Sequence, residues 1–595
     1  RAARPGYPDG AARAGRARSG TIGKGRQNTE AALPKGAPRS PADVCVFFAY
    51  SGQMSDKPLS RNRQWGPNLP AKRERARSSV VVCWLLLVLL TACTGPRPPS
   101  DPMVFNRDDA ASVFSAGFDG ITSFYIEETD LSSLAVAGLS GLKNLDNAIT
   151  VADRGDLIIV GRNDHEVAAL SVPDADDVAR WSMLMAAAVD SGRQVSDTLR
   201  EAPPEALYDA IFKGALRDLD RFSRYTTSAE ATRSRAHRRG YSGIGILLFE
   251  NHGTIYIEEV YEDGPAAHSG LQVGDSILAI DGNSVTGLDA IAVSDLLRGP
   301  SGSIVRVTTS SDETHRTARI TRAPVIEQTV FPSRKGDSAY FEIRSFNEDT
   351  ASSLGRKVGE AAAKIGPSMN GIILDLRNNR GGVLRDAIAI ADLFIRDGRI
   401  LLTKGRHARS VKEFTAHKPD IAVGIPLILL INHESASASE VVAGALQDSG
   451  RAVLIGGRTY GKGTVQMIVR LPNEGELIIT WARMYTPSGY PIGPFGVYPT
   501  ICTDEIEDPL LQHVAGTART AAVRARELLR LRRIAQDLDD SIQEALLGRC
   551  GDRKPATDGA DLDLALALKL LGERNLFDRA FEASLIASQW PSNAQ

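Results

Sequence analysis

The chain has 595 residues, of which 43% are hydrophobic and 24% are charged, the balance of an ordinary globular protein with room for several domains. Its formal net charge of -2 excludes a general electrostatic attraction to nucleic acid or to an anionic membrane. None of its five cysteines forms a C-x-x-C pair or a cluster with histidines at metal-ligand spacing, so we expect no metal.

The first 93 residues show no folding pattern, and only their last part, residues 79–93, is expected to be a targeting signal. Residues 1–78 show little apolar periodicity, so we interpret them as disordered or as translated sequence upstream of the true start, with a functional basic tail as the alternative. Residues 79–93 contain an apolar run at 80–90 that follows basic residues. This run is far shorter than the roughly 20 residues that span a bilayer as a helix, which favours a secretory signal.

The signal ends in Leu90-Thr-Ala-Cys93, which resembles a bacterial lipobox. By that resemblance the signal is cut before Cys93 and the cysteine is lipidated, so the mature chain is anchored outside the cytoplasm, at the periplasmic face of a membrane. The alternative is a chance cysteine after an ordinary signal. In an oxidising compartment Cys502 and Cys550 are compatible with a disulfide, although sequence alone does not show that their separation allows one.

The mature chain begins with a linker and a mostly helical domain, residues 94–236. Residues 176–192 and 204–222 place apolar side chains at steps of three and four, which predicts amphipathic helices. We expect this domain to serve packing and assembly.

From residue 240 the pattern changes to short strands separated by glycine-rich turns. The β-rich runs lie at 241–249, 253–261, 275–282 and 303–310, with a short helix at 265–268 and a longer one at 288–299. This order resembles a PDZ domain over residues 240–325. By that resemblance a glycine-containing loop binds a C-terminal carboxylate through its backbone N–H groups, beside a strand edge that accepts a peptide; its residues are Gly243, Ile244, Gly245 and Ile246. The alternative is a purely structural turn.

Residues 330–503 alternate strands with helices, which predicts an α/β layered domain. We expect strands at 338–346, 371–376, 425–431, 452–457 and 476–486, and helices at 349–365, 383–395 and 436–447. The C-terminal region, 504–595, has amphipathic helical patterns that either pack on the preceding domain or mediate self-association. The predicted fold class is therefore multidomain α+β.

Three turn motifs follow strands of the α/β domain: LRNNRGG at 376–382, HESASASE at 433–440 and TYGKGTVQ at 459–466. The last one overlaps part of a nucleotide-binding loop, G-x-x-x-x-G-K, through Gly456, Gly461 and Lys462. Gly463 stands where that loop needs Ser or Thr to hold magnesium, and ATP is scarce outside the cytoplasm. We therefore reject a nucleotide site.

Together with the PDZ-like pattern, these motifs resemble the carboxyl-terminal processing proteases, also called tail-specific proteases, over about half of the chain. The resemblance implies a crotonase-like layered core and a serine endopeptidase that needs no cofactor. It makes Ser437 the nucleophile, Lys462 its general base and Gln466 the residue that orients the amine. It assigns the two oxyanion-binding N–H groups to Gly382 and Ala438.

The chemistry sets a condition on the base. A serine hydroxyl needs a base to accept its proton, but a lysine with an ordinary pKa near 10.4 is protonated at neutral pH. Burial away from carboxylates would lower that pKa, so we expect the Lys462 amine to be shielded from water.

Several neighbouring residues have competing interpretations. Ser437-x-x-Glu440 is also a capping box, so Ser437 can be read as a helix cap alone. His433 lies on the same loop as Ser437, which argues against a Ser-His-Asp arrangement. Arg298 matches an arginine that in this family links the PDZ domain to the active site, or it is a solvated surface residue. Arg380 departs from the Pro or Gly that is usual in the family.

The sequence thus predicts a protease that recognises protein or peptide C-terminal tails, cleaves near them through an acyl-enzyme, and reaches the membrane through its lipidated N-terminus. Self-association is compatible with the helical C-terminal region. The competing hypothesis is a catalytically silent PDZ adaptor on a protease scaffold.

Overall fold

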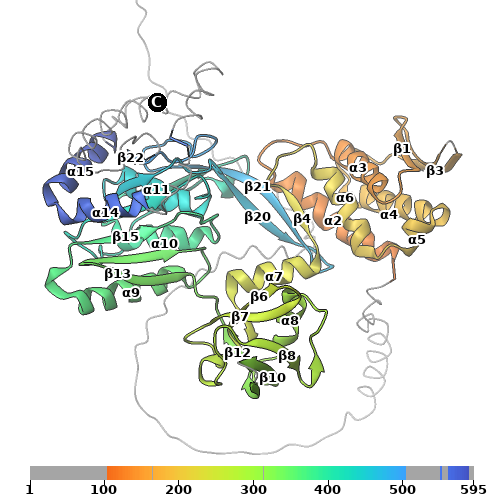
Figure 1. The fold of residues 1–595 in the computed structure, drawn as a ribbon. Coiled ribbons are helices and arrows are strands. Elements are labelled where there is room, and N and C mark those ends of the chain that lie inside the picture. The colour runs from red at the N-terminus through yellow and green to blue at the C-terminus, as the bar shows by residue number, and fades with distance from the viewer. Residues whose placement is uncertain (1–103, 164, 312–313, 504–549, 552–560, 589–595) are drawn as a thin grey trace, which may run out of the picture. The chain divides into compact units, whose positions relative to one another are not determined.

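The structure is a computed structural model that describes residues 104–163, 165–311, 314–503, 550–551 and 561–588 (Figure 1). The predictions for residues 1–78, for the signal at 79–93 and for Cys93 concern residues outside these ranges, as does most of the prediction for 504–595.

The region after the linker is mainly helical (Figure 1). Helices α4 and α6 form where apolar side chains recur at helical spacing, and large aromatic residues such as Phe212 and Trp181 are buried between the helices. A small antiparallel sheet, which the sequence pattern did not predict, packs Ile158 and Val160 against them. The elements are α2 (Arg107–Phe124), α3 (Leu131–Ser140), β1 (Ile149–Asp153), β2 (Leu157–Arg162), β3 (His165–Ser171), α4 (Val178–Val195), α5 (Asp197–Glu201), α6 (Pro204–Leu216) and α7 (Ser228–Arg239).

The PDZ-like region is an antiparallel sheet with one helix beside it. The strand order β11-β10-β8-β7-β6 leaves β6 at an edge, and β12 pairs separately with β5. The elements are β5 (Tyr241–Gly243), β6 (Ile246–Asn251), β7 (Thr254–Val260), β8 (Ser276–Ile280), β9 (Asn283–Ser284), α8 (Ala290–Leu297), β10 (Ile304–Ser311), β11 (Thr314–Thr321) and β12 (Ala323–Val325).

The α/β region is built on a sheet with the order β13-β14-β15-β18-β19-β22. From β14 onward each neighbouring pair is parallel, as expected for strands joined through helices. The strands are β13 (Val330–Lys335), β14 (Ser338–Ile343), β15 (Gly371–Asp375), β18 (Leu427–Ile431), β19 (Val453–Gly456) and β22 (Ile501–Cys502).

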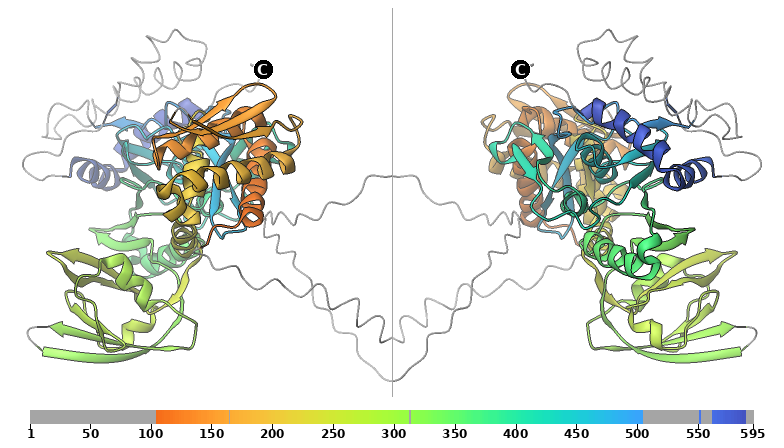
Figure 2. Two further views of the ribbon diagram at one scale, coloured as in Figure 1. Left: turned by 90° about the vertical axis from the view of Figure 1, so that its right-hand side faces the viewer. Right: turned by 90° about the vertical axis from the view of Figure 1, so that its left-hand side faces the viewer.

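Helices cover both faces of this sheet (Figures 1 and 2). Because side chains alternate along a strand, Leu374 and Leu429 enter the core on one face while Ile373 and Leu430 enter the core on the other. The first face packs against α9 (Thr350–Ile365), α10 (Leu384–Phe394) and α11 (Ala438–Asp448), and the second against α14 (Leu562–Gly572) and α15 (Arg574–Ser588). The two C-terminal helices therefore complete the layered core.

A second, antiparallel sheet connects the helical region to the α/β region. Its order is β17-β16-β21-β20, and the short strand β4 of the helical region pairs with β21. Leu477 and Ile479 of β21 enter the same hydrophobic core as Phe212 and Tyr225. The strands are β4 (Arg224–Thr226), β16 (Arg399–Lys404), β17 (Lys412–Thr415), β20 (Thr464–Arg470) and β21 (Glu476–Tyr485).

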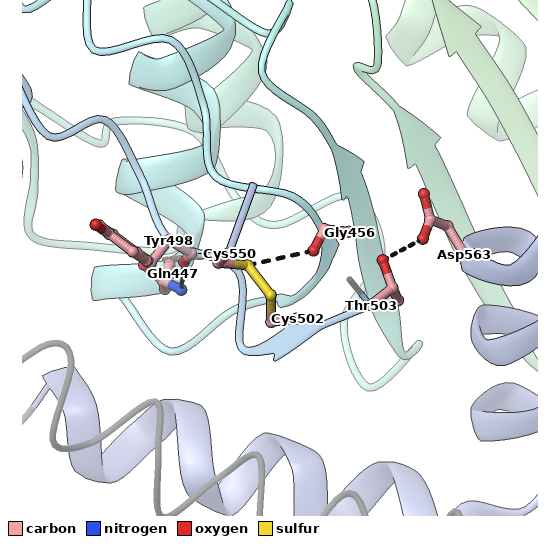
Figure 3. Close-up of a disulfide and its surroundings, with 7 residues drawn as sticks. All are labelled: Gln447, Gly456, Tyr498, Cys502, Thr503, Cys550 and Asp563. Atoms are coloured by element: carbon pink, nitrogen blue, oxygen red, sulfur yellow. Dashed lines mark hydrogen bonds between the residues drawn. A yellow bond between two sulfur atoms is a disulfide. The ribbon is translucent and has the colours of Figure 1, made fainter. Parts of the chain in front are cut away.

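A disulfide joins Cys502, on β22, to Cys550, with 5.8 Å between the two Cα atoms (Figure 3). Cys550 also contacts the segment after β19: its carbonyl accepts the N–H of Arg458 at 2.9 Å, and its sulfur lies 3.6 Å from the carbonyl oxygen of Gly456. The disulfide that the sequence left open is therefore present, and it holds Cys550 beside the loop that carries Lys462.

Candidate active site

The three turn motifs follow β15, β18 and β19, which are adjacent parallel strands. The carboxyl ends of parallel neighbours lie at one edge of a sheet, the usual position of a site in such folds. The sheet order therefore brings together segments that are up to about 80 residues apart in the chain.

Ser437 sits at the sharp turn between β18 and α11, where it is the N-cap of the helix, and its N–H donates to Glu440, which is one half of the predicted capping box. Its φ of 56° and ψ of -110° lie in a region that residues with a side chain rarely adopt. Such a conformation costs on the order of 1–3 kcal/mol and persists only where surrounding contacts enforce it. The strain marks Ser437 as more than an ordinary helix cap.

Glu440 supplies much of that enforcement, because its fully buried carboxylate binds both the nucleophile loop and the lysine loop. Oε2 accepts the N–H of Ser437 at 2.7 Å and the N–H of Lys462 at 2.9 Å. Oε1 accepts the N–H of Gly461 at 2.7 Å and the hydroxyl of Thr459 at 2.6 Å. Burial raises the pKa of Glu440, and these four hydrogen bonds oppose the rise.

Further hydrogen bonds tie the nucleophile loop to the other two motifs. The carbonyl of Asn379 accepts the N–H of Ala436 at 3.0 Å and the hydroxyl of Ser439 at 2.8 Å. The N–H of Tyr460 donates to the carbonyl of Ser435 at 3.0 Å. Asn379 is itself fixed, since its amide donates to the carbonyl of Ile343 at 2.6 Å.

Gly382 and Ala438 meet the first requirement for oxyanion donors. Phe346 bridges Gly382 through the carbonyl of Gly381 and the N–H of Val383, so the N–H of Gly382 is not used in that bridge. Neither the Gly382 N–H nor the Ala438 N–H has a hydrogen-bond partner within the described ranges. Gly382 has φ of 152° and its added Cβ would lie 2.1 Å from the Phe346 carbonyl oxygen, so only glycine fits there.

Lys462 is partly buried, and its amine lies 5.2 Å from the centroid of the Phe222 ring. Burial lowers the pKa of Lys462, and the nearby charge of Arg224 lowers it further, while Glu440 and Asp220 act in the opposite direction. The net shift is downward, which is the direction that a lysine acting as a base at moderate pH requires.

The side chain of Gln466 contacts two threonine hydroxyls. Its side-chain nitrogen donates to the hydroxyl of Thr464 at 2.9 Å and to the hydroxyl of Thr480 at 3.3 Å. Thr480 in turn donates to Asp220 at 3.0 Å. These hydrogen bonds of Gln466 hold β20 to β21, and its role toward Lys462 stays a prediction.

The PDZ-like loop at residues 243–246 connects β5 to the edge strand β6. Gly245 has φ of 78°, and a Cβ there would lie 2.9 Å from the Cα of Gly264, so glycine is required. Helix α8 lies beside β6, and Phe249 and Ile291 on these two elements are exposed apolar residues. An open strand edge beside a helix is the arrangement that accepts a peptide as an added strand.

The remaining sequence candidates have local partners. Arg298 bonds Asp295 at 2.9 Å and lies over the Tyr241 ring, both within the PDZ-like region. The His433 ring packs against Tyr460 with 5.5 Å between the centroids. Arg380, the departure from the family pattern, bonds Glu434 across the two turns at 2.7 Å. In the part of the chain that the structure describes, no group of acidic, histidine and cysteine residues could hold a metal ion.

Two features of the site were not predicted from the sequence. Glu440 was expected only as a partner in a helix cap, and the contact of Phe222 with Lys462 was not expected at all. The role of Glu440 had a signal in the sequence: a glutamate in the first turn of an apolar helix becomes buried, and a buried carboxylate must find several hydrogen-bond donors. The second had none in the sequence, because the contact between Phe222 and Lys462 depends on how β4 pairs with β21.

Comparisons with known proteins identify the families and relatives that this chain matches. The model of peptidase family S41 matches residues 337–503, and a PDZ-domain model matches residues 256–309. The chain is 36% identical over 316 residues to a carboxy-terminal-processing protease of Bartonella bacilliformis, covering 52% of this chain and 72% of the relative. It is 32% identical over 322 residues to the chloroplastic C-terminal processing peptidase of Tetradesmus obliquus, covering 50% and 68% respectively. A solved structure of the photosystem II D1 C-terminal processing protease is 26% identical and has a TM-score of 0.31, covering 62% of this chain and 92% of that one.

We predict that Glu440→Ala lowers the free energy of unfolding by about 3 kcal/mol or more. The substitution leaves three backbone N–H groups without their acceptor, and each such buried group costs about 1–3 kcal/mol, offset in part because a charge is no longer buried. Urea denaturation measures the change. Glu413→Ala is the matched control: this exposed carboxylate pairs with Arg399, and its loss should cost less than about 1 kcal/mol. Equal stability of the two variants would contradict the bridging role of Glu440.

Proposed function

The chain belongs to the carboxy-terminal-processing proteases of peptidase family S41, with a PDZ domain, and on that premise we propose that it is a serine endopeptidase with a Ser437-Lys462 dyad. We propose that it binds the C-terminal tails of proteins or peptides and cleaves near them. It needs no cofactor for this reaction.

One observation carries the proposal: the buried carboxylate of Glu440 binds the backbone N–H of Ser437 and that of Lys462 through the same oxygen. This shared acceptor holds the loops of the proposed nucleophile and base side by side. The downward pKa shift of Lys462 and the strained backbone of Ser437 support the same two roles.

In the acylation step the neutral amine of Lys462 accepts the proton of the Ser437 hydroxyl while Oγ bonds to the scissile carbonyl carbon. The carbonyl electrons move onto oxygen, and the N–H groups of Gly382 and Ala438 stabilise the resulting oxyanion; one such donor is worth roughly 3 kcal/mol. When the C–N bond breaks, the Lys462 ammonium returns its proton to the leaving amine. Ser437 then carries the acyl group as an ester.

Deacylation repeats the same proton transfers with water. Lys462 accepts a proton from the attacking water, and the tetrahedral intermediate forms in the same oxyanion site. Its C–Oγ bond then breaks and Oγ takes the proton back from Lys462. The N-terminal dipole of α11, which begins at Ala438, favours the negative charge in both steps.

Tail recognition is assigned to the edge strand β6 and the loop before it. We propose that a substrate tail pairs with β6 and places its free carboxylate against the N–H groups of residues 243–246.

We also propose that the mature chain is anchored to the membrane through lipidated Cys93 and acts on the extracytoplasmic side. This proposal rests on the sequence at 80–93. No helix in the described ranges is long and apolar enough to cross a bilayer.

Ser437→Ala and Lys462→Ala are each expected to abolish peptide cleavage while a tail peptide still binds. In the unchanged enzyme, kcat/KM should rise with pH, because the base must be neutral, and the midpoint should lie below the ordinary lysine value of 10.5.

Covalent labelling tests the nucleophile separately. A fluorophosphonate probe should label the unchanged chain and not Ser437→Ala. Cleavage by Lys462→Ala at an undiminished rate would overturn the dyad, and absence of labelling and cleavage in the unchanged chain would favour the PDZ adaptor.

Peptides with free and amidated C-termini test tail recognition. Hydrogen bonds to a charged group contribute about 1.5–3 kcal/mol, so amidation should lower kcat/KM about tenfold or more. Comparison of matched peptide pairs measures the effect. Equal cleavage of both forms would refute carboxylate recognition and leave the proposed protease chemistry standing.

Lipidation is tested by expressing the full chain in a bacterium supplied with labelled palmitate. The chain should incorporate the label and sediment with membranes, and Cys93→Ala should lose both properties. Label that persists in Cys93→Ala would refute the anchor, whereas loss of labelling in Cys83→Ala would place the lipid elsewhere.

A further inference from the structure

The helical N-terminal region reaches the site through the segment at residues 217–226, which ends in β4. Strand β4 pairs with β21, and β21 pairs with β20, which begins two residues after Lys462. The segment is thus attached to the sheet that carries the proposed base, although it belongs in sequence to a different region.

Asp220 fixes the backbone of this segment. Its Oδ1 accepts the N–H of Phe222 at 2.7 Å and the N–H of Ser223 at 3.0 Å. The same oxygen accepts the hydroxyl of Thr480 at 3.0 Å, and the N–H of Thr480 donates to the Ser223 hydroxyl at 3.0 Å. Because Thr480 is a buried residue of β21, these bonds hold Phe222 on the sheet.

Two cationic side chains lie close to the Phe222 ring. The Lys462 amine is 5.2 Å from the ring centroid, and the Arg221 guanidinium carbon is 4.7 Å from it. Arg221 also lies 5.3 Å from the Tyr460 ring, and the N–H of Tyr460 bonds the nucleophile loop at Ser435. Arg221 therefore connects the ring to the loop that carries Lys462.

We propose that Phe222 is a positioning residue of the reaction, whose ring covers the Lys462 amine and excludes water from it. This inference rests on the proposed role of Lys462 as the base. It makes the helical region a contributor to the site, where the sequence predicted only packing and assembly. Without this ring, water would reach the amine from the side of the 217–226 segment.

Two opposite effects of the ring must be compared. A ring face attracts an ammonium, and in a desolvated site this contact is worth about 2 kcal/mol, which favours the protonated amine by a factor of about 30. Exclusion of water favours the neutral amine, and for buried lysines this effect reaches factors of a thousand or more. Exclusion of water therefore dominates. The charged groups around the amine are Arg224, which disfavours the ammonium, and Glu440 and Asp220, which favour it.

The test uses the full chain with Phe222→Ala and Phe222→Leu. Phe222→Ala admits water, so the midpoint of the rise of kcat/KM with pH should move up by about one unit or more, with about a tenfold loss at neutral pH that high pH restores. Phe222→Leu keeps the apolar bulk and should keep the midpoint within half a unit. Phe331→Ala is the control: it removes a ring on β13 that contacts Arg344, and it should leave the pH profile of kcat/KM unchanged.

A second measurement does not depend on turnover. In a Ser437→Ala background, acetic anhydride labels neutral amines, and mass spectrometry of the Lys462 peptide at several pH values gives the protonation midpoint directly. The same upward shift is expected when Phe222→Ala is added. An unshifted midpoint, or a loss of activity by one factor at every pH, would overturn the inference. If Lys462→Ala still cleaves, the proposed dyad fails instead, so the two failures are distinguishable.

Discussion

The geometry of the site depends on one buried carboxylate that accepts hydrogen bonds from two loops. Glu440 receives the N–H of Ser437 from its own loop and the N–H groups of Gly461 and Lys462 from the next one. Because three of its four donors are backbone groups, the carboxylate fixes main-chain positions independently of side-chain rotamers. A strained φ at Ser437 can persist only under such multiple restraint.

The same carboxylate creates an electrostatic difficulty, since an anion near Lys462 favours the ammonium form. Two features of the structure counter this effect: the Glu440 oxygens accept hydrogen bonds from other groups, and the Lys462 amine is removed from water. The Glu440 oxygens are directed at backbone donors and the Thr459 hydroxyl, and the opposing influences on the amine are burial and the charge of Arg224. The lysine pKa shifts downward in spite of two nearby carboxylates, which means that desolvation is the stronger effect here.

Local sequence patterns predicted much of the fold because, in most strands and helices of the α/β region, the apolar residues recur at the spacing of that element. Strands such as β15 and β18 and helices such as α9 lie where the apolar runs indicated. The motif order also predicted which turns carry chemistry. Pairing between distant segments was beyond such patterns: β20 was read as part of a glycine-rich turn, and the contact of β4 with β21 depends on residues about 250 positions apart.

The α/β core extends beyond the segment that matches the peptidase family, residues 337–503. Parallel strands are buried on both faces, and Ile428 and Val453 would face water if nothing covered the second face. Leu566, Leu570 and Phe577 of the C-terminal helices supply that cover.

The C-terminal region is also attached to the edge of the sheet that carries the site. Ion pairs of Arg377 with Asp561 and Asp563 hold the first of these helices next to the turn that contains Gly382. The disulfide at Cys550 attaches the same region beside Gly456 and Arg458, at the base of the lysine loop. The C-terminal region is therefore joined to the sheet at the edge where the reaction is proposed, and the stability of that edge depends on residues that no catalytic motif includes.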